Sequence, residues 1–336
     1  MTNPADQIDV QDWYSPAVPR KELKKLVKRT NWHAVFYFGL WFLLLGAFGY
    51  LASRLFLARS WWALPAFFVY GVIYTGNNPR WHETSHGTPF KTPWLNDFFY
   101  FLCGAMEFRD TVDFRWSHAR HHSYTKMRGI DPEIAADRPP NLFYMIIDFF
   151  YIRMGLIAIK NLFLHSFGIV SDEIKAYVPE EELPKMYWSA RAVLALHLAV
   201  IGLAVYLQSW LPVLLFGLPR FYGAFFMWTF IWLQHVGLAE NVWDHRLSTR
   251  SLRVNFFFSF LFMNMENHLE HHLYPMVPFH KLPSLRERIK EDLPTPYRSM
   301  WQGSMELVPA LLKQKKDPSY SIRRPLPQES TLPEEG

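Results

Sequence analysis

Histidines form three clusters in this chain, with a spacing that suits metal binding. The clusters are His82 with His86, His118 with His121 and His122, and His268 with His271 and His272, and a solitary His235 precedes the third. Residues three or four apart share one face of a helix, so each cluster can direct its imidazoles toward one point. Neutral imidazole suits iron, copper, nickel and zinc, whereas calcium and magnesium require oxygen ligands. The clusters therefore predict a transition-metal site.

The number of histidines favours two metal ions. A structural zinc site is complete with four ligands, and a catalytic zinc uses three protein ligands. The eight clustered histidines, or nine with His235, exceed the needs of one ion and would give each of two ions four or five nitrogen donors. The other five are interpreted as ordinary hydrogen-bonded residues: His33, His165, His197, His245 and His280.

Composition indicates a membrane protein, which is expected to be all-α, and excludes several other classes. Half of the residues are hydrophobic and 18% are aromatic. The single cysteine, Cys103, cannot form an internal disulfide or a four-cysteine metal site. The net charge of +5 is modest and its basic residues are concentrated in a few places, so nucleic acid is not an expected partner.

Uncharged stretches predict four transmembrane helices that position the histidine clusters. About 20 apolar residues suffice to cross the hydrocarbon core, and positions 34–53 and 61–79 supply the first two spans. Positions 192–239 contain Arg220 as their only formal charge and fit a hairpin of two further spans. Arg220 lies either inside the fourth span or at its outer end. The apolar but charge-interrupted stretch 142–167 is expected to be interfacial or buried.

The basic residues predict which side of the membrane carries the clusters. Six lysines and arginines at positions 20–29 place the amino terminus on the cytoplasmic side by the positive-inside rule. Two pairs of spans then bring all three clusters and the carboxyl terminus to that side, in a helical cap. The expected organisation is a polar and basic tail at 1–30, a membrane domain at 31–290, and a charged, proline-rich tail at 291–336 that ends in disorder.

These motifs resemble those of the membrane fatty acid desaturase superfamily, over approximately residues 80–288. The first box is Trp81-His82-Glu83-Thr84-Ser85-His86, and the second is Arg120-His121-His122-Ser123-Tyr124-Thr125 with Asp131-Pro132-Glu133. The third is Met265-Glu266-Asn267-His268-Leu269-Glu270-His271-His272, and His235 in Gln234-His235-Val236-Gly237-Leu238 matches an additional ligand. The two residues before the second His pair are typical of desaturases, whereas related alkane hydroxylases usually have three.

The resemblance implies a non-heme diiron centre that uses O2. Its metal ligands would be nine histidines: His82, His86, His118, His121, His122, His235, His268, His271 and His272. One departure is Ile231, which lies where stearoyl-type relatives place a metal-linked asparagine, and Asn241 or Asn264 could compensate. Carboxylates beside the boxes are candidates to receive the second N–H of a bound imidazole: Glu83, Asp131, Glu240, Glu266 and Glu270.

The expected function is therefore an O2-dependent membrane oxidoreductase that acts on unactivated C–H bonds, in first place a fatty acyl desaturase. It would take electrons from an external donor such as ferredoxin, or cytochrome b5, with its reductase, because no cytochrome b5 motif is present. One alternative is a hydroxylase or demethylase of a hydrocarbon, carotenoid or small methylated compound. Alternatives of other classes are a metal transporter, whose ligands would lie within the spans, and a zinc hydrolase, which needs only three or four ligands.

Overall fold

The computed structural model describes residues 11–327, and these are helical with no strand; only an isolated bridge joins Leu252 to Tyr297. The first half of the chain contains α1 Arg20–Leu26, α2 Asn31–Leu57, α3 Ala63–Tyr74, α4 Asn77–Ser85, α5 Pro93–Met106, α6 Asp113–Ser123, α7 Leu142–Asp148, α8 Ile152–Ser166 and α9 Asp172–Lys175. The second half contains α10 Leu183–Tyr206, α11 Leu211–Leu215, α12 Pro219–Tyr222, α13 Phe225–His235, α14 His245–Ser248, α15 Phe256–Leu261, α16 His268–Leu273, α17 Leu282–Ile289 and α18 Met300–Lys316. The all-α prediction is confirmed.

Two helical segments are long and apolar enough to cross a membrane. They are Arg20–Leu57, which includes α2, and Glu180–Tyr206, which includes α10. A third crossing is possible only if α7 and α8, which meet at a bend of 75°, form one broken span. Long apolar side chains on the outside of α2 and α10 remain exposed, as lipid-facing residues do. These apolar helices indicate a membrane protein.

The expected second and fourth spans are not single helices, so four full-length spans are not confirmed. α3 ends at Tyr74, and after a two-residue break α4 begins at Asn77 and carries the first His box. The segment expected to form the fourth span is divided among α11, α12 and α13. Gly217 adopts a φ of +90° between α11 and α12, and this left-handed conformation ends the helical path there.

A close backbone contact joins the two halves of the helical bundle. A β-carbon placed on Gly223 would lie 2.1 Å from the backbone carbonyl of Gly71, on the facing helix α3. Only glycine allows helices to approach this closely. α3 and α12 are therefore held together at a point where no side chain fits.

Arg220, whose position in the membrane the sequence left open, is buried in an ion pair. Its Nε lies 2.7 Å from Oε2 of Glu107, directly after α5, and both side chains are at most 2% exposed. The guanidinium also lies over the ring of Tyr151, 4.3 Å from its centroid. A charge in an apolar bundle requires such partners. Arg220 thus faces the protein interior, at the junction of α5, α8 and α12.

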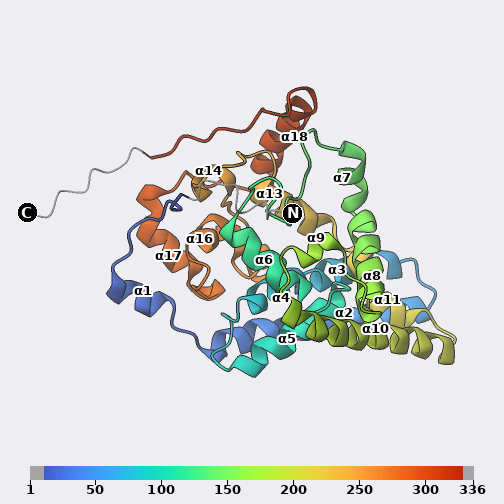
Figure 1. The fold of residues 1–336 in the computed structure, drawn as a ribbon. Coiled ribbons are helices and arrows are strands. Elements are labelled where there is room, and N and C mark those ends of the chain that lie inside the picture. The colour runs from blue at the N-terminus through green and yellow to red at the C-terminus, as the bar shows by residue number, and fades with distance from the viewer. Residues whose placement is uncertain (1–10, 328–336) are drawn as a thin grey trace, which may run out of the picture.

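The carboxyl-terminal segment contains a helix that the sequence analysis did not anticipate. The side chain of Ser299 accepts a hydrogen bond from the backbone N–H of Gln302 at 3.1 Å and so caps α18. Leu307 and Leu311 bury their side chains, and α18 packs against α13 at the upper side of Figure 1. Hydrophobic residues at helical spacing explain why this charged segment folds. The expected disordered end at 328–336, like the start of the amino-terminal tail at 1–10, lies outside the described residues.

Candidate metal centre

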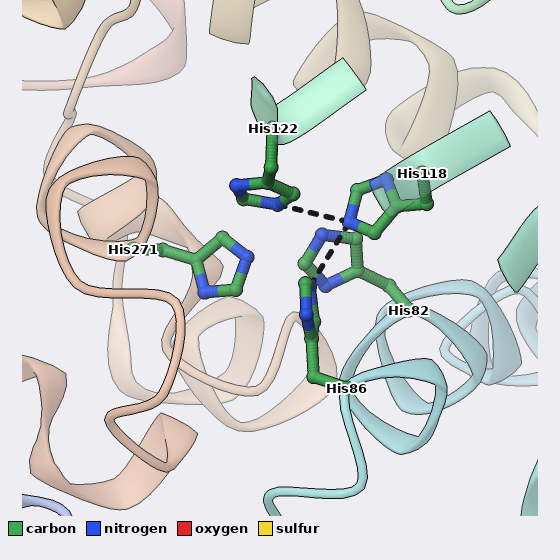
Figure 2. A group of neighbouring side chains, drawn as sticks. All are labelled: His82, His86, His118, His122 and His271. Atoms are coloured by element: carbon green, nitrogen blue, oxygen red, sulfur yellow. Dashed lines mark hydrogen bonds between the residues drawn. The ribbon is translucent and has the colours of Figure 1, made fainter. Parts of the chain in front are cut away.

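The histidines come from α4, α6, α13 and α16, which meet in the interior of the molecule (Figure 1). His82 and His86 lie one turn apart at the end of α4, and His118 and His122 lie one turn apart on α6. His271 of α16 faces both pairs, and Figure 2 shows the five rings directed toward one point. One ring nitrogen of each lies within 4.8 Å of the others, so these five side chains form a first group that could hold a metal ion.

A second group forms beside the first. His121, His235 and His272 have ring nitrogens within 4.8 Å of one another. His268 joins them, because its Nε2 lies 3.0 Å from Nε2 of His235 and 3.1 Å from Nε2 of His272. The structure thus brings all nine predicted histidines together, five in the first group and four in the second.

The division between the groups differs from the expectation that each cluster points to one place. His118 and His122 are four residues apart and share a face of α6, whereas His121 points to the second group. On α16, His271 belongs to the first group, while His272 and His268, four residues apart, belong to the second. The i,i+4 relation decides this division, because it aligns side chains more closely than neighbouring positions do.

Hydrogen bonds that Nδ1 donates orient several of the rings. Nδ1 of His118 lies 2.9 Å from Oε2 of Glu133, and Nδ1 of His121 lies 2.9 Å from Oδ2 of Asp131. In both cases Nε2 is left facing the centre of its group. Carboxylates in this position fix the ring orientation and raise the basicity of the ligand nitrogen.

Two further rings are oriented by neutral groups. Nδ1 of His235 lies 3.0 Å from the backbone carbonyl of Ser248, and Nδ1 of His272 lies 3.2 Å from Oγ1 of Thr125. Of these four partners, only Asp131 was among the sequence candidates. Glu133 could have been recognised as a candidate from the sequence, because it lies just after the second box and two residues from Asp131. Ser248 acts through its backbone, which side-chain identity does not predict.

The remaining candidate carboxylates divide into one that faces the histidines and three that do not. Oε1 of the fully buried Glu83 lies 3.6 Å from Nδ1 of both His82 and His271. Burial raises the pKa of Glu83 to about 7. Glu240, Glu266 and Glu270 instead contact other groups. Glu240 pairs with Lys126, Arg128 and Arg138, Glu266 accepts from Ser259, and Glu270 pairs with Arg286.

Burial keeps most of the imidazoles in the form that binds metals. It lowers the pKa of His82 and His86 to about 3, and it lowers the pKa of His118, His122 and His271 as well. His121 is the exception: burial lowers its pKa, the charge of Asp131 raises it, and the net shift is upward. A neutral imidazole has a free lone pair for a metal ion.

The donor set fits a transition-metal ion. Both ring nitrogens of His82 and of His271 are buried without a hydrogen-bond partner in the described part of the chain. A buried polar atom without a partner is costly, and coordination of a metal removes that penalty. Imidazole-only donors at these separations match iron, copper, nickel or zinc.

The five histidines expected to be ordinary residues include one neighbour of the site. His165 bonds Asp110 at 2.8 Å, and His197 bonds the backbone carbonyl of Ala105 at 2.9 Å. His33 and His280 stack on each other. His245, however, is buried, its ring centroid lies 5.0 Å from that of His272, and its ring stacks on Trp13. It therefore belongs to the wall of the second group.

Ile231 and the two asparagines do not approach the rings as ligands. Ile231 lines a cavity of about 380 Å³ next to the first group, together with Glu133. Oδ1 of Asn241 accepts from the backbone N–H of Arg128 at 2.9 Å, and Oδ1 of Asn264 accepts from Ser259 at 2.9 Å. Neither amide compensates for the missing asparagine.

Apolar spanning helices around a buried histidine cluster define a metal-binding membrane protein. The sequence profile of the family described as fatty acid desaturase matches residues 59–304, which include every histidine of both groups. The chain belongs to this family, as the His boxes indicated. A search among curated proteins finds no match. Family membership makes the protein a membrane oxidoreductase, with metal-dependent catalysis.

Proposed function

We propose that this protein is an O2-dependent diiron enzyme that removes hydrogen from an unactivated C–H bond, in first place a fatty acyl desaturase. The division of nine histidines into a group of five and a group of four carries this proposal, because one ion cannot use nine donors. Iron is preferred to zinc because the family implies redox chemistry. When bound, the two ions would supply the oxidising power that breaks the C–H bond.

The protein's own residues would set the ligand geometry. We propose all nine histidines as metal ligands, with Glu133 and Asp131 holding the rings of His118 and His121. Loss of such a partner typically costs about 10- to 100-fold in metal affinity or activity. Burial of the centre excludes water, which would otherwise compete for the coordination sites.

We further propose that the centre faces the cytoplasm, where an external donor such as ferredoxin or cytochrome b5 delivers two electrons per turnover. The basic helix α1 supports this orientation. It lies on the same side of the molecule as the third box, since Glu22 pairs with Arg288 of α17. Cysteine labelling provides a test, because the native Cys103 is buried. Lys21→Cys should react with a membrane-impermeant maleimide in inside-out vesicles but not in intact cells, and the reverse would refute this orientation.

A second candidate, a hydroxylase or demethylase of a small methylated compound, is favoured by the cavity beside the first group. Its volume of about 380 Å³ is near the lower end of ligand-binding sites. Its lining includes charged side chains, among them Arg109, Arg153 and Asp137. A small polar molecule would suit this lining better than a bare hydrocarbon chain.

Product analysis under labelled oxygen distinguishes the two, together with iron quantification. Desaturation predicts a product two mass units lighter than the substrate and without label, whereas hydroxylation predicts incorporation of labelled oxygen. Activity without O2 or reductant would instead indicate a hydrolase. Purified protein without bound iron, but with measurable metal flux in vesicles, would indicate a transporter and refute the enzyme proposal.

A further inference from the structure

A second, larger cavity lies away from the histidines, between α7, α13, α15 and α18. Its volume is about 930 Å³, at the upper end of the range for small-molecule sites. Aromatic and aliphatic side chains dominate its walls, including Phe149, Phe225, Trp232, Phe258 and Leu311. An apolar space of this size suits a hydrocarbon chain.

Two arginines give the cavity one charged end. Arg253 and Arg298 are exposed residues of its lining, and that lining contains no aspartate or glutamate. The segments that carry Arg253 and Arg298 are joined through their backbones, because the N–H of Arg253 donates to the carbonyl of Tyr297 at 2.7 Å. Neither guanidinium has a carboxylate oxygen of a described residue within 4.0 Å, and Arg253 interacts electrostatically with Glu266 and Glu270 only beyond that distance. The charged end is therefore available to an anion.

The rim of the cavity presents large apolar side chains to the outside. On α18, Trp301, Met305, Val308 and Leu312 are all more than half exposed and recur at intervals of three or four residues. They form one stripe along the helix. Such a stripe is typical of a helix that lies in a membrane interface.

The opposite rim repeats this pattern. Phe143 and Ile146 of α7 are exposed, as is Phe256 at the start of α15, three residues after Arg253. Trp301 likewise follows Arg298 by three residues. α7 and α18 lie together at the upper side of Figure 1. Aromatic residues next to arginines mark the level of lipid headgroups in membrane proteins.

We propose that this cavity binds one anionic phospholipid from the adjoining leaflet. An acyl chain would fill the apolar space, and the phosphate would lie between Arg253 and Arg298. Guanidinium groups recognise phosphate through paired, charge-assisted hydrogen bonds. A zwitterionic lipid would gain less, because the lining offers no carboxylate for its ammonium group. The proposal concerns lipid binding alone and is independent of the reaction at the metal centre.

Native mass spectrometry of the full chain in detergent tests this proposal. The protein is equilibrated with dioleoyl phosphatidylglycerol, with dioleoyl phosphatidylcholine, or with oleate, and the bound molecules are counted. We expect one phosphatidylglycerol per chain at concentrations where the other two are not retained. Equal retention of phosphatidylcholine, or displacement of phosphatidylglycerol by equimolar oleate, would overturn the proposal.

Two double variants distinguish lipid binding at a specific site from general electrostatic attraction between the protein and anionic lipid. Arg253→Gln with Arg298→Gln should weaken phosphatidylglycerol binding by about 30-fold, since each basic side chain near an anionic lipid contributes about fivefold. The matched control is Lys315→Gln with Lys316→Gln, which removes two exposed charges from the far end of α18 and should leave binding unchanged. Equal losses in both double variants would refute a specific site.

A third variant tests the apolar part of the cavity. Ser304 lines the cavity and is half-buried. Ser304→Phe should fill the space and release the lipid, although both arginines remain. A Ser304→Phe protein that melts as the wild type does and still retains phosphatidylglycerol would overturn the placement of the acyl chain. If that variant does not fold, the arginine and lysine variants alone decide the outcome.

Discussion

The ion pair between Arg220 and Glu107 gives a sharp prediction about stability. Both side chains are at most 2% exposed, and the two atoms lie 2.7 Å apart. At an effective dielectric constant of about 20, charges at this distance attract each other by about 6 kcal/mol. Part of this attraction offsets the loss of hydration of the two groups. Removal of one partner leaves the other charge buried alone, which costs about 3 to 5 kcal/mol.

We therefore expect Glu107→Gln and Arg220→Met each to lower the free energy of unfolding by about 3 to 5 kcal/mol. For a chain of 336 residues, the midpoint of thermal unfolding in detergent should fall by about 4 to 7 °C. The double variant Glu107→Gln with Arg220→Met removes both charges and should lose less stability than either single variant. The double-mutant cycle should therefore give a coupling of about 3 kcal/mol or more.

An exposed pair serves as the matched control. Arg115 and Asp97 lie 3.1 Å apart, but their side chains are 43% and 67% exposed. Asp97→Asn should change the free energy of unfolding by less than about 1 kcal/mol, because water screens the pair. If Glu107→Gln lowers the free energy of unfolding as little as Asp97→Asn does, burial of the Arg220 charge does not determine the cost, and the prediction is refuted.

Other variants test the metal centre and the helix contact. His271→Ala should abolish activity and lower the iron content by about half, because it removes a donor from one group only, while membrane insertion persists. Full activity in this variant would refute the ligand assignment. Glu133→Gln, which weakens the orientation of His118, should reduce metal affinity by about 10- to 100-fold, as measured by chelator competition. Gly223→Ala should prevent folding because of its backbone clash, whereas Gly202→Ala, which meets no atom within 4 Å, should be tolerated and stabilise α10 by about 1 kcal/mol. Circular dichroism melting curves distinguish the two alanine variants.

The sequence was sufficient to predict which histidines assemble, because their clusters stand out from the apolar stretches. It did not predict how the histidines divide between the two groups. The group that His121 joins depends on the direction of α6 relative to the other helices of the site. The role of Ser248 could not be predicted either, because its backbone carbonyl is positioned by the end of α14, whose last residue it is. His245 was expected to be an ordinary hydrogen-bonded residue, but its Nδ1 has no hydrogen-bond partner among the described residues, and its proximity to His272 became visible only in the fold.

The limits of hydropathy as a predictor explain why the observed helices differ from the expected spans. An uncharged stretch of sufficient length predicts a span, but it does not reveal breaks such as the one at Gly217. Arg220 could not be placed, because its partner Glu107 is more than 100 residues away in the sequence. The segment that forms α18 was predicted to be part of a charged, proline-rich tail, and the reason for its hydrophobic residues is seen only in their packing against α13.

The distribution of the histidines over the chain has a consequence for biosynthesis. The first two boxes emerge from the ribosome roughly 150 residues before His272, an interval on the order of ten seconds at typical elongation rates. During this time His82, His86, His118 and His122 have been synthesised, but His271, the fifth member of their group, has not. Incomplete imidazole sites favour copper over iron by intrinsic affinity. If the ions are iron, as proposed, their selection would require that metal be withheld until translation has passed the third box, which would make metal delivery a matter of timing as well as of chemistry.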